Sequence, residues 1–449
     1  MSDVDLLVRG GRVVSDSGVT IADVGIVKGT ITAVGASLSL SADEVIDAEG
    51  LHVFPGGVDS HVHFNEPGRT EWETIATGSG ALAAGGYTTF IDMPLNSRPV
   101  TTSGVAFDAK LRAAAASSVA DFGLWGGMVP DNLVHLEELV QRGVMGFKAF
   151  MCPSGIDDFP QSDDRTLREG MKRIAQLDSI LLLHAEDAAM IDDLTRRTLA
   201  AGRKSPRDFI RSRPAAAELE AISRAISIAG ETGCRIHIVH VSTARGVQLV
   251  TEAQAGGVDV SCETCPHYLL YTEEDIERLG GLGKCAPPFR TSKDRDGLWQ
   301  QMSDGELPIV VSDHSPSTLD LKQGPDFFKL WGGIAGCQST RHLLLWQARA
   351  RSLGPATVAA LTASNAARRF RLGQKGEVAV GFDADLWLAD LSIEGVVRRE
   401  DLLYRNPFSA HEGKPTRGRT SRTLIRGQTA FMDGRVDRSS RGRFIRPTR

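Results

Sequence analysis

The chain has 449 residues and a formal net charge of -5 at pH 7, with a sequence pI near 6.2. Its 41% hydrophobic and 24% charged residues are typical of a globular protein and argue against a disordered chain, while the negative net charge and the low pI argue against a dedicated nucleic-acid binder. The length exceeds the usual size of one domain, so we expect one large domain and one smaller domain.

The opening "MSDVDLLVRGGRVV" carries acidic residues where a signal peptide carries basic ones, and no apolar run follows it. No run reaches the about 18 apolar residues of a membrane span, so we expect a cytoplasmic protein. The six cysteines are too scattered for a disulfide scaffold. Cys262 and Cys265 form an unmatched CxxC in a predicted strand, which we interpret as structural, with a metal or redox site as the alternative.

The first fifty residues predict short strands broken by turns: "DLLVRGGRVV", "IADVGIVKG", "TITAVGA" and "EVIDAEG". The chain from Gln374 repeats this character in "GEVAVGFDADLWLADL" and "RTLIRGQTAFMDGRV". We therefore expect residues 1–54 and 374–449 to pair in one small β domain. The tail from Lys414 to Arg449 has eleven basic residues against Asp433 and Asp437, and we interpret it as a solvated or subunit-contacting surface.

Between these ends, eight short apolar runs alternate with helical segments. The first run begins at Leu51, and we assign residues 55–373 to the large domain. The runs are "LHVFPGGVD", "TTFIDMP", "DFGLWGGM", "GFKAFM", "SILLLHAE", "RIHIVHVS", "DVSCETC" and "PIVVSDHS". Helical segments include "PAAAELEAISRAISIAGETG" and "ARGVQLVTEAQAGG". Repeated strand–helix units of this number favour an α/β fold with a closed (β/α)8 TIM barrel over an open doubly wound sheet. Neither GxxxxGK[ST] nor GxGxxG is present to support a nucleotide-binding fold.

An HxH pair, His61 and His63, ends the first run. Residues i and i+2 of a strand point the same way, so both imidazoles can face one pocket, although core histidines show this pattern too. Four further polar residues stand at or near the ends of later runs: Lys148, His184, His240 and Asp313. Active sites of barrel enzymes form at these strand ends, so we predict that all six residues share one site.

Lys148 lies in the apolar run "VMGFKAFM". A bare ammonium in such surroundings costs several kcal/mol of desolvation unless it is paired or neutralised. A neutral lysine amine can add carbon dioxide to give a carbamate, whose two oxygens can bridge two cations. We therefore hypothesise that Lys148 is carbamylated.

Several motifs resemble those of the cyclic amidohydrolases of the amidohydrolase superfamily: "PGGVDSHVHF", "GFKAF", "LLHAED", "IVHVST", "ETCPHYL", "APPFR", "SDHSP" and "GFDADLWL". The resemblance covers nearly the whole chain. It implies two divalent metal ions, zinc first, with iron, cobalt or manganese as alternatives. The ligands it implies are His61, His63, Lys148 and Asp313 for one ion, and His184 and His240 with the shared Lys148 carbamate for the other. It also implies a small terminal β-sandwich and a homo-oligomer, often a homotetramer.

The implied reaction is ring hydrolysis. Two divalent ions lower the pKa of a bridging water and polarise a carbonyl, and Asp313 is placed to carry the proton to the departing nitrogen. The loops "HVHFNEPGRTEWE", "MPLNSRP", "LWGGIAGCQS" and "NPFSAHEGKP" look most like the branch that opens the hydantoin ring of allantoin to allantoate, a step of ureide breakdown. The alternative is a hydantoinase or dihydropyrimidinase. A scaffolding relative and a binding module without turnover fit poorly, because all six ligands are present.

Five residues are candidate substrate contacts: Asn65, Asn96, Ala286, Ser315 and Gly332. Asn65 stands where dihydroorotases commonly carry arginine, so we expect a neutral substrate and a pocket without a fixed cation. Ser315 matches a position associated with substrate contact, with a turn-forming serine as the alternative. Ala286 and Gly332 match backbone contacts of hydantoinases, and Asn96 lies with Arg69 in loops predicted to reach the mouth of the pocket.

Overall fold

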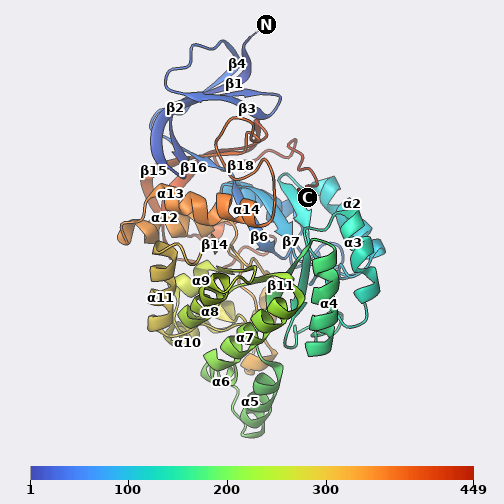
Figure 1. Ribbon diagram of the computed structural model, residues 1–449. Helices are drawn as coiled ribbons and strands as arrows, with labels where there is room; N and C mark the ends of the chain where they lie inside the picture. The colour runs from blue at the N-terminus through green and yellow to red at the C-terminus, as the bar shows by residue number, and fades with distance from the viewer. Residues whose placement is uncertain (1, 449) are drawn as a thin grey trace.

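The computed structural model describes residues 2–448 and has a mixed α/β fold. Figure 1 shows a sheet built from the two ends of the chain at one pole and a larger body covered by helices below it. Within residues 2–448, no helix combines the length and the hydrophobicity that a membrane span requires.

The sheet at the pole joins N-terminal to C-terminal strands. Its members are β1 (Val4–Ser15), β2 (Gly18–Val27), β3 (Thr30–Gly35), β4 (Ala42–Asp47), β5 (His52–Pro55), β15 (Leu386–Val396), β16 (Pro415–Ile425), β17 (Gln428–Met432) and β18 (Arg435–Val436). The two sets meet where β5 pairs antiparallel with β15, with Leu386 opposite Pro55. A separate apolar core, which includes Val8, Val24 and Leu388, packs within this sheet. The predicted pairing of the two chain ends is confirmed.

Much of the basic tail is built into the fold. Strands β16 to β18 belong to the terminal sheet, and the segment after them lies beside β8 (Asp121–Leu124). There the Ile445 N–H donates to the Phe122 carbonyl (2.8 Å), and the Phe122 N–H donates to the Arg443 carbonyl (2.9 Å). The strands predicted in "RTLIRGQTAFMDGRV" are confirmed: Leu424 and Phe431 are buried while Arg419 and Arg435 are exposed, and the solvated or subunit-contacting role of the tail stays a prediction.

Parallel strands form the body, and every predicted run contains at least one of them. They are β6 (Gly57–Val62), β7 (Tyr87–Asp92), β8, β9 (Gly126–Gly127), β10 (Phe147–Phe150), β11 (Ile180–His184), β12 (Arg235–Ile238), β13 (Val260–Thr264) and β14 (Ile309–Val310). Strands β6 to β8 form one parallel sheet, and β9 to β14 form another. Only Trp125 separates β8 from β9, and its N–H donates to the Asp92 carbonyl at the end of β7 (3.0 Å).

The first and last of these strands also meet. His314, four residues beyond β14, makes a parallel bridge to Val62 at the end of β6. The His63 N–H donates to the His314 carbonyl (2.8 Å). The histidine pair after β6 is thereby brought beside the segment that carries Asp313.

Helices follow most of the parallel strands. They are α1 (Ile75–Ala84), α2 (Gly104–Ser117), α3 (Leu136–Arg142), α4 (Asp164–Gln176), α5 (Ala188–Ala200), α6 (Pro206–Ser212), α7 (Ala215–Thr232), α8 (Ala244–Ala255), α9 (Pro266–Leu270), α10 (Ile276–Leu279), α11 (Ser292–Ser303), α12 (Thr340–Ala350), α13 (Pro355–Ala359) and α14 (Asn365–Arg369). Asp187 caps α5 and Thr243 caps α8, each through a first-turn N–H. These caps lie three residues beyond His184 and His240, so the helix starts restrain both histidines.

Candidate metal centre

The six predicted ligands gather at the carboxyl ends of the parallel strands. His61 lies in β6 and Lys148 in β10, while His184 is the last residue of β11. The other three follow their strands: His63, His240 and Asp313. His240 and Asp313 have positive φ angles of 41° and 44°, which residues other than glycine rarely adopt. Such strained backbone is common where side chains are aimed at a functional site.

Two groups of ligand atoms are visible. Asp313 Oδ1 lies 3.3 Å from His61 Nε2 and 3.5 Å from His63 Nε2. On the other side, His184 Nδ1 lies 3.0 Å from His240 Nε2. The rings of His61 and His240 are 5.5 Å apart, so the two groups are neighbours. This spacing suits two cations held side by side.

Three of the four imidazoles have their other nitrogen occupied. His61 Nδ1 lies 2.7 Å from Glu263, His184 Nε2 lies 2.8 Å from Glu186, and His63 Nδ1 lies 3.4 Å from the Leu95 carbonyl. A carboxylate or carbonyl on the far nitrogen fixes the ring and leaves the near nitrogen free to bind a metal. Glu263 and Glu186 therefore support the centre without facing it.

Sequence reasoning missed these two carboxylates. Glu263 lies inside the apolar strand β13 and also approaches His237 (3.1 Å), while Arg213 pairs with Glu186 (2.5 Å). Burial raises the pKa of Glu186, but the positive charge of Arg213 and the contact with His184 outweigh it and lower that pKa below its usual range. A glutamate inside a buried strand was the available signal, since it needs a partner.

Lys148 lines the same cavity as both groups, and its charge acts on His61, His184 and His240, so it fits a metal-bridging role. Its side chain is buried, and within residues 2–448 its Nζ has no hydrogen-bond partner. Burial lowers its pKa from 10.5 to about 7, which makes the neutral amine accessible at ordinary pH. The nearest aromatic ring, Phe150, lies 5.0 Å from Nζ and stacks on His184. Conversion of this unpaired amine to a carbamate would turn it into a metal ligand.

The protonation states also suit metal binding. Burial lowers the pKa of His61, His184 and His240, so these imidazoles are neutral, as metal ligands must be. Burial alone would raise the pKa of Asp313, but His61 and His63 outweigh it and lower that pKa, so the carboxylate is ionised. The donor set thus consists of neutral nitrogens and an anionic oxygen, which divalent zinc-like ions prefer.

A cavity of about 370 Å³ opens over this centre. Its wall includes His61, His63, Asn96, Lys148, His184, His240, Ala286, Asp313, Ser315 and Gly332. Four of the five predicted substrate contacts are therefore on the wall. Arg69 is not among the lining residues; its Nη1 donates to the Asn96 carbonyl (3.0 Å) and so supports that loop.

The structure bears on two further predictions about this cavity. Asn65 is buried and is not among the lining residues; among the described residues its side-chain amide has no hydrogen-bond partner, so its role as a substrate contact stays a prediction. The cavity also contains cations, since its wall includes Arg213, Lys284 and Lys329. Arg213 is paired with Glu186 and Lys284 donates to two backbone carbonyls, whereas Lys329 is exposed, so the wall still offers a cation that a carboxylate can approach.

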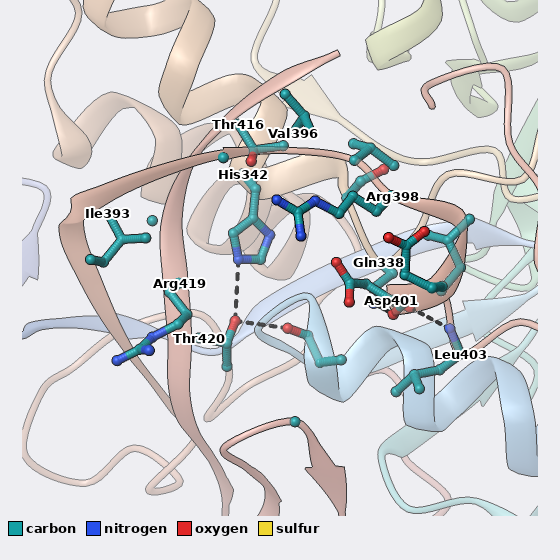
Figure 2. A pocket seen from close by; sticks show the side chains of 18 of the residues that line it. Gln338, His342, Ile393, Val396, Arg398, Asp401, Leu403, Thr416, Arg419 and Thr420 are labelled. Carbon is teal, nitrogen blue, oxygen red and sulfur yellow. Dashed lines mark hydrogen bonds between the residues drawn. The ribbon is translucent and has the colours of Figure 1, made fainter. Parts of the chain in front are cut away.

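A second cavity, of about 610 Å³, lies between α12 and the β15–β16 pair. Figure 2 shows hydrogen bonds among the residues that line it: His342 Nε2 contacts the Thr420 hydroxyl (3.2 Å), and the Gln338 side chain accepts from the backbone N–H of Leu403 (2.8 Å). None of the six predicted ligands is on its wall. Size alone therefore does not identify the reactive site.

Comparisons with known proteins agree with this site. The model of the Amidohydrolase family matches residues 52–429. The chain is 54% identical to an allantoinase of Rubrobacter xylanophilus, over 100% of this chain and 99% of that one, and 49% identical to an allantoinase of Solibacter usitatus, over 99% and 97%. Among solved structures, the L-hydantoinase (dihydropyrimidinase) of Arthrobacter aurescens superimposes with a TM-score of 0.95 at 34% identity, covering 98% of this chain and 99% of that one.

These findings define the class of the protein: the chain belongs to the amidohydrolase family. By full-length similarity, its relatives within that family include the bacterial allantoinases.

Proposed function

We propose that this protein hydrolyses the hydantoin ring of allantoin to allantoate at a centre that holds two divalent cations. The observation that carries the proposal is the convergence of His61, His63, Lys148, His184, His240 and Asp313 on one cavity in a chain 54% identical to an allantoinase. As ligands, His61, His63 and Asp313 would hold one ion, and His184 and His240 the other. A carbamate on Lys148 would bridge them, with zinc as the first candidate metal.

The residues divide the chemistry between them. When bound, the two cations would lower the pKa of a water to near neutrality and polarise the carbonyl of the ring amide. Asp313 is ionised and stands within 3.5 Å of two ligand nitrogens, so its carboxylate can accept the proton of that water. The water oxygen adds to the carbonyl carbon of the ring amide, and Asp313 then donates the proton to the ring nitrogen as the C–N bond breaks, which leaves a carboxylate and a ureide. Asn96 and Ser315, with the backbone at Ala286 and Gly332, would orient the neutral ureide.

The proposal extends to the architecture. We infer that the parallel strands of residues 55–373 close into a (β/α)8 barrel, and that residues 1–54 and 374–449 form a β-sandwich. The bridge from His314 to Val62 and the short link at Trp125 support closure, because they join the two parallel sheets at both places where a ring requires it. A homotetramer acting in the cytoplasm completes the proposal, and sedimentation should give four times the chain mass of 48.3 kDa.

The test is turnover of four rings side by side: allantoin, hydantoin, dihydrouracil and dihydroorotate. The purified protein is assayed after incubation with zinc, cobalt or manganese and bicarbonate, and ring opening is followed at the carboxylate product. Allantoin should be the best substrate. Hydantoin as the best substrate would favour a hydantoinase, a function that the likeness to the Arthrobacter aurescens enzyme makes the second candidate.

A further inference from the structure

Residues 328–333 form a strap that runs along one wall of the catalytic cavity. All six of them line it, and Gly332 is one of the candidate substrate contacts. The strap contains no helix beyond the end of the short 3-10 turn Phe327–Lys329, so regular secondary structure does not hold it in place. Something else must fix its backbone.

Two buried lysines bind the strap from behind. Lys284 Nζ donates to the carbonyls of Phe328 (2.9 Å) and Leu330 (2.6 Å). Lys322 Nζ donates to the carbonyl of Trp331 (3.1 Å) and to that of Gly333. Four of the six strap carbonyls thus accept from two ammonium groups.

These ammonium groups have no acidic partner. Both lysines are 5% exposed, and no described residue places a carboxylate within ion-pair distance of either Nζ. The nearby carboxylate of Asp326 is paired with Lys204 instead (3.1 Å). Lys284 is further stabilised by the Phe209 ring, 4.8 Å away. Burial lowers the pKa of Lys284 to about 8 and that of Lys322 to about 7, and the protonated and the neutral amine both keep N–H groups that donate to the strap carbonyls.

The strap is also clamped at its far end. The Gly333 N–H donates to the Lys284 carbonyl (2.7 Å), and the Trp331 N–H donates to the Leu321 carbonyl (2.9 Å). Gly333 has a φ of 149°, and a Cβ there would lie 2.5 Å from the Ser315 carbonyl. The strap therefore has almost no free travel between Ser315 on the cavity wall and the two lysines behind it.

We propose that Lys284 and Lys322 are positioning residues for the ring-opening reaction. Through four carbonyls they hold the strap so that its backbone at Gly332 meets the substrate, and they thereby set KM. Neither lysine donates a proton in the reaction, and neither binds a metal ion. The expected change in KM rests on the proposed function, whereas the expected change in strap mobility does not.

The experiment compares Lys284→Met and Lys322→Met with the metal-loaded wild type. Methionine keeps the length of the side chain and removes the donors. Lys204→Met is the matched control, because the Lys204 side chain pairs with Asp326 and no hydrogen bond from it to a strap carbonyl is present among the described residues. Three quantities are measured: hydrogen exchange of residues 328–333 without substrate, bound metal, and the kcat and KM for allantoin.

We expect exchange of the strap to rise at least about tenfold and kcat/KM to fall about 10- to 100-fold, mainly through KM, with metal content unchanged. The control should match the wild type. Unchanged strap exchange and unchanged KM in both variants would overturn the inference, as would loss of metal in place of the KM effect. If Lys322→Met does not fold, Lys284→Met decides alone, since its methionine keeps the contact with Phe209. A wild type inactive on allantoin would refute the proposed function, while the exchange data would still test the clamp.

Discussion

Replacing Lys148 with methionine should make the metal-free protein more stable while abolishing its activity. The side chain is buried without a hydrogen-bond partner among the described residues, and its pKa falls from 10.5 to about 7. That difference in pKa corresponds to a loss of about 5 kcal/mol in the free energy of unfolding, because folding buries the charged amine. Methionine has a similar length and no charge, so it removes this cost without leaving a large cavity.

The pH dependence of the stability gain follows from the same values. Below pH of about 7 the amine of Lys148 is protonated in the folded and the unfolded chain, and the whole penalty of about 5 kcal/mol applies. Between about 7 and 10.5 only the unfolded amine is protonated, so the penalty shrinks by about 1.4 kcal/mol per pH unit and is about 3 kcal/mol at pH 8. Above 10.5 it vanishes.

The assay is chemical denaturation of Lys148→Met and wild type at pH 7, 8 and 10, with metal and carbon dioxide removed. The variant should be more stable by about 4 to 5 kcal/mol at pH 7 and by less than about 1 kcal/mol at pH 10. Added metal and bicarbonate should then stabilise the wild type but not the variant, because only the wild type can form the carbamate. A variant no more stable than wild type at pH 7, or a gain independent of pH, would refute the reasoning.

Three further predictions concern the centre and its substrate. Asp313→Asn should keep the fold and lower kcat by at least about 10² to 10⁴, because an amide is a poor base; a small loss with an unchanged pH profile would place the base elsewhere. Glu186→Gln should weaken binding of the ion at His184 about 10- to 100-fold, so a metal titration should show one strong site and one weak site; two strong sites would contradict the support assigned to Glu186. Allantoin should exceed dihydroorotate by at least about 10³ in kcat/KM, because Arg213 is paired with Glu186 and Lys284 donates to two carbonyls; comparable rates would show that Arg213, Lys284 or the exposed Lys329 receives the carboxylate.

The convergence of the six predicted ligands on one cavity was predictable because each residue is tied to the end of a strand. His61, Lys148 and His184 lie within or at the end of apolar runs that are legible in the sequence, and parallel strands bring their ends to one edge. Glu263 was not predictable in the same way: its contact with His61 joins residues 202 positions apart and depends on which strands face each other. Helices α7 and α8 were predictable from their periodicity and the glycines that follow them.

The substrate wall was less accessible to sequence reasoning. Asn65 follows His63 by two residues, and strand alternation favours a common direction, but the chain leaves the extended conformation after Phe64 and alternation no longer applies. Lys322 ends the 3-10 helix Leu319–Lys322 and Lys284 follows the 3-10 helix Gly280–Gly283, and helices this short show no periodicity that would indicate that the two lysines are buried. Loop geometry depends on tertiary contacts that local patterns do not encode.

The pairing of β5 with β15 has a consequence for synthesis of the chain. About 330 residues separate Pro55 from its partner Leu386. At about 5 to 20 residues per second, the ribosome needs about 15 to 65 s to supply that partner. Until then the edge of β5 has unpaired backbone N–H and carbonyl groups. The apolar face of β1 to β3 also lacks Leu386 and Leu388, two residues of the core that packs against it. Newly made chains must therefore pass through an interval in which their first strands can pair wrongly with one another, and slower translation lengthens it.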